Sequence, residues 1–261
     1  MKKTCMAAAS FLLIILLTVQ CVLAADIPFS KEGELQLEDY SEILLQADEV
    51  LVTEETIDSY LELMKQDLAE ISGGTLPELS DSFISEYSEM YFGFPLDSVQ
   101  AAREYIRGTL EESNKKNALI AALRDKATVL SYPEDVYQMA SQYAADEIAY
   151  YALQEELEPD ELAILSGYGS AEDYKMIQTD EYVKTAMLID QILEKEGIVY
   201  QEEERDKALE SYMQDLGYDA YTSPEEFKET AGETWLWLFT EFHYKSDLVY
   251  DVLKDRIRIA E

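Results

Sequence analysis

Hydrophobic residues recur at helical spacing over most of the chain from residue 53 onward. In the first such segment Thr53 is a suitable N-terminal cap, and the pair Gly73 and Gly74 ends the pattern. Its apolar residues fall on one face of a single helix, which the spacing therefore predicts. These residues are Ile57, Tyr60, Leu61, Met64, Leu68 and Ile71.

Two longer helices follow. Asp97 or Ser98 opens a polar-faced helix that the pattern carries to about Leu130, a length of roughly 50 Å at about 1.5 Å per residue. Pro133 restarts the chain, and a second long helix is predicted from there to about Leu157. A compact globule does not need helices of this length.

The remaining pattern predicts five further helices with recognisable ends. Serine or proline begins most of them, and glycine follows the last turn of three. They are a short helix from Ser80 or Asp81 through Tyr87, a short helix from Pro159 to Gly167, a helix from Ser170 to Gly197, a helix that ends at Gly217, and a last helix that begins after Ser223-Pro224 and carries apolar residues to Ile257.

Residues 25–52, which precede the first predicted helix, have a different pattern. Residues 25–40 show no sustained period and are predicted as a flexible segment, whereas residues 41–52 alternate loosely and predict one short strand or an extended arm. The whole chain has only 10 Gly and 6 Pro, few for an all-β fold with many turns. The predicted fold class is mainly all-α, with an extended segment at 25–52 and a helical domain at 53–261.

The first 24 residues have the organisation of a secretory signal peptide. Lys2 and Lys3 precede an apolar run, and the sequence Val-Leu-Ala ending at Ala24 is typical of a cleavage site. Two alternatives are lipidation of Cys21, which the preceding Gln20 disfavours, and retention of the leader as a membrane span. With cleavage the protein is exported and contains no cysteine, because both cysteines lie in the leader.

The charge balance excludes several classes of partner. The chain has 55 acidic and 20 basic residues, a formal charge of −35 that becomes −37 when Lys2 and Lys3 leave with the leader. Such a chain is repelled by nucleic acid and by anionic membranes, so membrane contact is expected only through an uncleaved or lipidated leader. Because 48% of the residues are hydrophobic, the chain can still bury a core.

No motif of nucleotide, metal or hydrolase chemistry is present. The sequence has no phosphate-binding glycine loop, no nucleophile elbow and no zinc-binding histidine pair, and its one histidine, His243, lies between Phe242 and Tyr244. We expect that imidazole to lie among aromatic rings, either packed or at the surface. The run Glu202–Glu204 is expected to be a solvated helix face. No cofactor, metal or catalytic constellation is therefore predicted.

Aromatic residues gather at two places. Residues 91–95 (YFGFP) predict a loop whose rings either anchor it in a core, the favoured interpretation, or face outward as a contact surface. In the last helix Trp235 and Phe239 share one face and are expected in the core, whereas Trp237 lies off that face and is predicted to be an exposed contact.

The order of several short motifs resembles trigger factor, the bacterial folding chaperone. Residues 76–83 (LPELSDSF) are similar to the Leu-Pro-Glu-Leu-Asp-Asp-x-Phe segment that follows the prolyl-isomerase domain of that family. The other similar segments are residues 38–40 (EDY), 50–58 (VLVTEETID), 98–107 (SVQAAREYIR) with 110–112 (LEE), and 133–136 (PEDV). The ribosome-binding loop has no counterpart, and where the isomerase domain would be inserted the chain has only residues 71–75.

The resemblance implies a helical substrate-binding body with two projecting arms, similar also to the periplasmic chaperone SurA. The implied function is that of an exported, ATP-independent chaperone, which binds unfolded or nascent exported polypeptides without a cofactor and assists their folding or transport. Two alternatives stay open: a prolyl isomerase, and a structural or adhesive envelope protein. The candidate client-binding residues are Tyr91, Phe92, Phe94, Tyr168 and Trp237.

Overall fold

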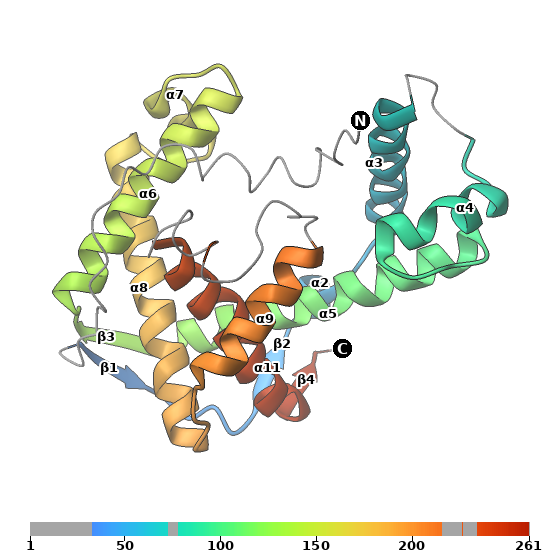
Figure 1. The fold of residues 1–261 in the computed structure, drawn as a ribbon. Helices are drawn as coiled ribbons and strands as arrows, with labels where there is room; N and C mark the ends of the chain where they lie inside the picture. Colours follow the sequence, from blue (N-terminus) through green and yellow to red (C-terminus); the bar gives the residue numbers. More distant parts are fainter. Residues whose placement is uncertain (1–32, 73–77, 216–225, 227–233, 261) are drawn as a thin grey trace.

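The computed structural model describes residues 33–72, 78–215, 226 and 234–260. Within these residues the chain is mainly helical, which confirms the predicted all-α class. The predicted leader with both cysteines lies outside this part of the chain, as does the helix start predicted at residues 223–225. A central body carries two projecting groups of helices on opposite sides, which we call the first and second arms (Figure 1).

The first arm consists of α3 (Glu54–Ser72), α4 (Asp81–Phe92) and the N-terminal half of α5 (Val99–Asp125). Their predicted caps are confirmed: Thr53 accepts a hydrogen bond from a backbone N–H of the first turn of α3, and serines do the same at α4 and α5. The arm has its own core, formed by Val52, Ile57, Leu61, Met64, Leu68, Phe83, Ile84, Ala102 and Ile106.

The second arm consists of α6 (Glu134–Gln154), α7 (Pro159–Leu165) and the N-terminal half of α8 (Ala171–Glu196). One carboxylate joins α6 to α8, because Glu147 accepts hydrogen bonds from three tyrosine hydroxyls. The donors are Tyr143, Tyr174 and Tyr182, with O···O distances of 3.3, 2.6 and 2.8 Å. The burial of these rings and the nearby Glu147 raise the pKa of each tyrosine.

The body is built around the C-terminal halves of α5 and α8 and around α11 (Ser246–Leu253). The short α2 (Ala47–Val50) packs on α5, and α9 (Glu202–Asp215) packs on a π-helix, η2 (Phe239–Lys245). The largest buried side chains of this core are Ile43, Leu45, Leu119, Leu123, Leu188, Ile189 and Ile192. The body core and the first-arm core are separate clusters.

Among the described residues, two segments of the chain join these cores. One is the short link at residues 50–52, where Val50 belongs to the body core and Val52 to the first-arm core, and the other is a polar stretch of α5. Between Ile106 and Ala118 no side chain is buried, and the sequence there includes Gly108 and the run EESNKKN at 111–117. Lys116 anchors the stretch to α11 through an ion pair with Asp247, with Nζ 2.6 Å from Oδ1. Gly108, Ser113 and Asn114 are weak helix formers, and no buried side chain supports the helix here. This part of α5 is therefore expected to open more readily than its ends.

The described residues include four short strands, and three of them lie in segments that were predicted as helix or flexible chain. β1 (Glu34–Leu37) pairs antiparallel with β3 (Ala127–Ser131), and β2 (Ile43–Leu45) pairs in parallel with β4 (Ile257–Ile259). Only β2 agrees with the strand predicted in 41–52. The helix predicted to run to Leu130 ends at Asp125, and the last helix ends before Ile257, because each of these ends finds a pairing partner about 90 or more residues earlier in the chain.

The last predicted helix is also not continuous. Residues 234–238 are helical, η2 follows as a π-helix, and α11 and the 3₁₀ turn Lys254–Arg256 complete the segment. Ser246 Oγ donates to the carbonyl of Glu241, five residues earlier, at 3.2 Å. A pattern of period 3.6 does not indicate a π-helix, and this explains why it was not predicted.

The turn after α6 carries the one positive φ among the described residues other than glycine, 56° at Glu156. The turn is a Schellman motif: the N–H of Leu157 donates to the carbonyl of Ala152 and that of Glu156 to Leu153, at 2.8 and 3.3 Å. Glu156→Gly is expected to raise the free energy of unfolding by roughly 0.5–1 kcal/mol, because glycine adopts this conformation without strain. Urea unfolding measures the change.

The neighbouring position supplies the matched control. Glu155 has a φ of −88° and no need of glycine, so Glu155→Gly should not stabilise the protein. Equal effects of the two substitutions would contradict the strain at Glu156.

Candidate functional site

An open aromatic groove lies on the first arm, where the end of α4 meets α3 and α5. α4 ends at Gly93, whose φ of 79° is left-handed and whose N–H donates to the carbonyl of Glu89 at 3.1 Å. The turn leaves a hollow of about 430 Å³ beside α5. Its lining residues are Tyr60, Met90, Tyr91, Phe92, Gly93, Tyr105, Ile106, Thr109 and Leu110.

Tyr105 is the central ring of this groove. It receives Phe92 and Phe94 edge to face, with centroid distances of 5.3 and 4.8 Å, and Tyr91 meets Phe92 in the same manner at 5.4 Å. Tyr105 is 37% exposed and Phe94 36%. Met90 beside them is 52% exposed. The groove therefore offers solvent a set of rings and a flexible thioether.

The same residues are also anchored. The Tyr91 hydroxyl donates to Asp67 of α3 at 3.1 Å, and the backbone N–H of Leu96 donates to Ser88 Oγ at 2.7 Å. Tyr91 and Phe92 are the last residues of α4, not part of a loop as predicted, because the helix continues to its cap at Gly93. Both interpretations of the aromatic cluster thus apply: one side of it anchors the turn, and the other faces solvent.

The first arm is strongly acidic. Residues 53–112 include fourteen acidic and three basic side chains. All three basic groups form ion pairs on the arm: Lys65 with Glu62, Arg107 with Glu54, and Arg103 with Glu54 and Asp58. The hydrogen bond from Arg103, followed by that from Arg107, lowers the pKa of Glu54. The groove itself has no charged lining residue.

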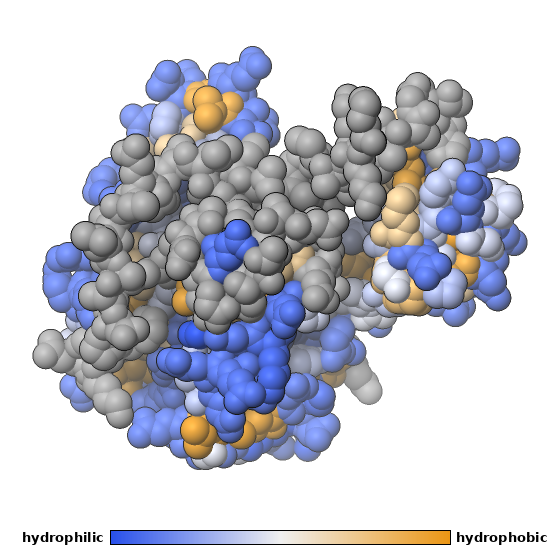
Figure 2. All heavy atoms as spheres, in the orientation of Figure 1, coloured by the Kyte–Doolittle hydropathy of each residue, from blue (hydrophilic) through white to orange (hydrophobic). Residues whose placement is uncertain are grey.

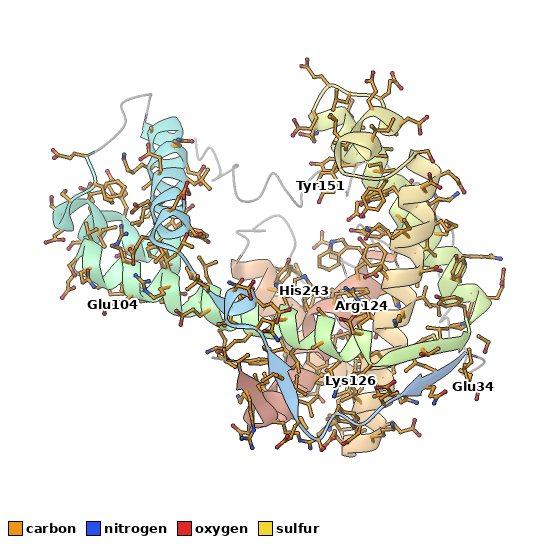
Figure 3. All side chains as sticks on the ribbon, turned by 180° about the vertical axis from the view of Figure 1, so that it is seen from behind. Glu34, Glu104, Arg124, Lys126, Tyr151 and His243 are labelled. Atoms are coloured by element: carbon orange, nitrogen blue, oxygen red, sulfur yellow. The ribbon has the colours of Figure 1, made fainter. Side chains whose placement is uncertain are left out.

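Tyr91, Phe92 and Phe94 are the three candidates that the structure brings together. Tyr168 lies on the second arm, where its ring meets Tyr174 at 5.0 Å and its hydroxyl accepts a hydrogen bond from Gln178. Figure 3 shows how far apart the two arms lie, with Glu104 on the first, Tyr151 on the second, and Arg124 and His243 in the body between them.

The predicted exposure of Trp237 is wrong. Its side chain is only 3% exposed, because α6 and α8 cover the side of the last helix that the sequence pattern left open. The ring packs against Phe242 at 5.5 Å. Its buried neighbours on α6 and α8 are Val136, Ala140, Val183 and Ala186. Trp235 and Phe239 are buried as predicted.

Of the groove residues, only Tyr91 and Phe92 were among the candidates, and the large exposed side chains of Tyr60, Met90 and Tyr105 were missed. The helical pattern placed Tyr60 on the buried face of its helix, yet it is 41% exposed. Tyr105 precedes the buried Ile106, and neighbours on a helix point about 100° apart, so only one of the two can face the core. The position of Tyr105 next to Ile106 could therefore have predicted that its ring is exposed.

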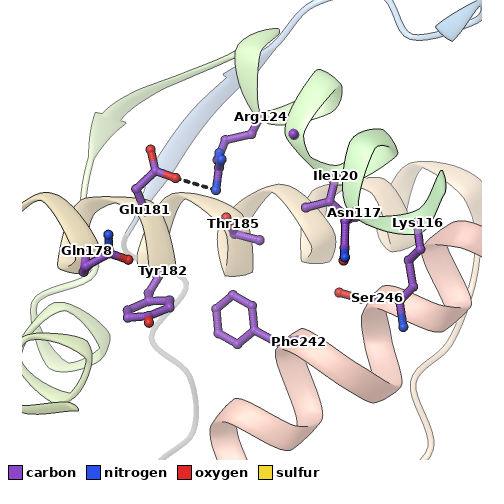
Figure 4. A pocket seen from close by; sticks show the side chains of 11 residues that line it. Lys116, Asn117, Ile120, Arg124, Gln178, Glu181, Tyr182, Thr185, Phe242 and Ser246 are labelled. Carbon is purple, nitrogen blue, oxygen red and sulfur yellow. Dashed lines mark ion pairs between the residues drawn. The ribbon is translucent and has the colours of Figure 1, made fainter. Parts of the chain in front are cut away.

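A second hollow, of about 330 Å³, lies in the body between α5, α8 and the η2–α11 segment (Figure 4). Tyr182 and Phe242 form an edge-to-face pair at its side. Its two cations, Lys116 and Arg124, are engaged in ion pairs with Asp247 and Glu181. The hollow therefore has no net attraction for an anion and ranks behind the aromatic groove.

Among the residues that the structure describes, no group of three His, Cys, Asp or Glu side chains is arranged to hold a metal ion, and no helix has the length and apolarity of a membrane span. His243 lies against the rings of Tyr212 and Phe239, at 5.0 and 5.9 Å, as the sequence predicts.

No protein-family model matches the chain, and no curated protein is significantly similar to it.

Proposed function

We propose that the protein is an exported, ATP-independent chaperone of the trigger-factor C-terminal type, which binds unfolded or partly folded polypeptides in the aromatic groove of the first arm. The observation that carries the proposal is the position of the groove. Exposed rings gather around Tyr105 on a projecting arm that has its own core, away from the main core of the protein. Exposed aromatic clusters of this kind mark interaction sites.

The groove suits a varied set of clients. Edge-to-face rings accept apolar side chains of many shapes, and the unbranched Met90 adapts its rotamer to the space that remains. Because the lining carries no charge, binding there does not require one particular partner group. Several weak contacts of this type form and break without nucleotide hydrolysis.

The acidic surface supports the same function. Exposed aromatic rings are an aggregation hazard for the protein that carries them, and a high net charge of one sign opposes self-association. The formal charge of −35 supplies that repulsion. Export of the protein is part of the proposal and rests on the predicted leader at residues 1–24.

The protein is expected to suppress the aggregation of a chemically unfolded client, and Tyr105→Ala is expected to weaken this effect. Tyr105 is the central ring of the groove and is 37% exposed, and one aromatic contact with a client side chain would contribute about 0.5–1.5 kcal/mol, so the variant should need roughly fivefold more protein for the same suppression. Light scattering during dilution of the client from denaturant measures the effect.

Val199→Ser is the control for this experiment. Val199 is 78% exposed and lies in the body between α8 and α9, so its replacement removes exposed apolar surface outside the groove. It should leave suppression unchanged. Unchanged light scattering with an excess of the wild-type protein would overturn the proposed function, and a clear acceleration of proline-limited refolding would favour the isomerase alternative.

A further inference from the structure

The outer end of the second arm carries an aliphatic surface that no other described element covers. We call it the tip patch, and it consists of the most exposed aliphatic residues there: Leu153 at 71%, Ile164 at 59% and Leu165 at 74%. They belong to the end of α6 and to α7, which contact each other. Figure 2 shows hydrophobic atoms at this end of the arm, bordered by hydrophilic ones. Ile164 and Leu165 are adjacent in α7 and Leu153 lies at the end of α6, which contacts α7, so we infer that the three side chains form one contact surface.

Acidic residues surround the tip patch. Residues 153–177 include seven acidic side chains and one basic side chain, Lys175, which is paired with Glu172 at 2.6 Å. Asp160 and Glu161 accept backbone hydrogen bonds that shape the turns, whereas Glu155 and Glu156 of the turn after α6 are exposed. The strained φ of Glu156 means that a carboxylate occupies a position where glycine would be relaxed.

These charges decide which partner fits the tip patch. A second copy would bring the same acids face to face, and an anionic membrane would be repelled. We propose that the tip patch docks a cationic amphipathic helix of a partner protein, with its apolar face on Leu153, Ile164 and Leu165 and its lysines or arginines toward the surrounding carboxylates. This inference does not depend on the proposed function, which concerns the other arm.

Three labelled 18-residue peptides test the inference by fluorescence anisotropy with the purified protein. The first is an amphipathic helix of Leu and Lys, the second has the same composition in an order without an apolar face, and the third replaces Lys by Glu. The first should bind roughly tenfold or more tightly than either of the others, and added salt should weaken it. Equal binding of the reordered peptide would overturn the inference in favour of an unfolded-chain site or simple charge attraction.

Substitutions locate the site. Ile164→Ser combined with Leu165→Ser should weaken the first peptide roughly fivefold or more, as should Glu155→Lys combined with Glu156→Lys. The matched charge control is Glu202→Lys with Glu210→Lys on α9, where both side chains are exposed and the change in net charge is the same. Undiminished binding by both tip variants, or an equal loss in the α9 variant, would refute a site at the tip.

The two proposals fail separately. The Ile164 and Leu165 variant should suppress client aggregation as well as the wild type does, because neither residue lies in the aromatic groove. Tyr105→Ala should bind the cationic helix normally for the converse reason. If the same variants abolish both activities, the tip patch is part of the client site and the inference is wrong.

Discussion

Lys245→Met is expected to lower the free energy of unfolding by about 3–5 kcal/mol at pH 9 but by only about 1–3 kcal/mol at pH 6. Lys245 Nζ lies 2.6 Å from Asp190 Oδ1 of α8 and 2.7 Å from Glu241 Oε1, and it is also 5.2 Å from the centre of the Tyr200 ring. Glu241 is 1% exposed. Urea unfolding of both proteins at the two pH values measures the difference.

The pH dependence follows from the protonation of Glu241. Burial, with a further contribution from Asp190, raises the pKa of Glu241 from 4.5 to about 8, and Lys245 opposes this rise. The folded protein therefore retains a proton that the unfolded chain releases. The stability linked to this proton is complete below pH 4.5 and is lost as the pH rises through about 8.

Removal of Lys245 raises the pKa of Glu241 further. At pH 6 the carboxyl of Glu241 is neutral with or without the lysine, and the variant loses a hydrogen bond to Glu241 together with the ion pair to the half-exposed Asp190. At pH 9 the wild type has an ion pair between Glu241 and Lys245. In the variant Glu241 must either be buried as an unpaired charge or remain protonated at a pH where an exposed carboxyl is ionised, and both cost stability. The variant is therefore penalised more at the higher pH.

The double variant Glu241→Gln with Lys245→Met isolates this effect. It has no buried carboxyl at position 241, so its free energy of unfolding relative to Glu241→Gln alone should differ little between pH 6 and pH 9. An equal cost of Lys245→Met at the two pH values in the otherwise wild-type protein would contradict the account.

The sequence predicted the helices well because their ends are chemically marked. Ser80, Ser98 and Ser170 each accept a hydrogen bond from a backbone N–H in the first turn, and Gly197 ends α8 with a φ of 71°. These interactions are local, within four residues in the chain, and can be seen in a single sequence. The mainly helical class follows from them.

The strands and the burial of Trp237 depend on distant parts of the chain. β1 pairs with β3 across about 90 residues, and the ring of Trp237 is covered by α6 and α8. A periodic pattern shows which face of an element is apolar, but it does not show what covers the other face. The polar residues Glu241 and Lys245, buried on a π-helix, have no signal in helical spacing either.

The sequence identified only part of the aromatic groove, because the groove also depends on contacts between distant parts of the chain. Phe92 and Phe94 are neighbours in the sequence and stood out as a cluster, whereas Tyr60 and Tyr105 reach the groove from α3 and α5. Only the packing of three helices brings these rings to one place. A short aromatic run in a sequence therefore indicates where a groove starts, and the fold determines what completes it.

The first arm is expected to unfold locally when its own core is weakened. Ile84 is fully buried in that core, and Ile84→Ala should cost about 2–5 kcal/mol. Because the two cores are separate clusters, joined only through the link at residues 50–52 and the polar stretch 111–117 of α5 among the described residues, the cost should fall mainly on the arm. Hydrogen exchange by mass spectrometry should show exchange of the most protected amides of α3 and α4 accelerated by roughly 30-fold or more, while exchange in α6 and α8 stays unchanged.

Ile189→Ala is the matched control, since Ile189 is equally buried in the body core. It should accelerate exchange in α8, where Ile84→Ala does not. Local opening also disrupts the aromatic groove, because it moves α4, which carries Phe92, away from α5, which carries Tyr105. Ile84→Ala should therefore weaken suppression of client aggregation together with faster exchange in α3 and α4, whereas Tyr105→Ala should weaken it without that exchange. Equal acceleration in both arms by Ile84→Ala would show instead that the protein unfolds as one cooperative unit.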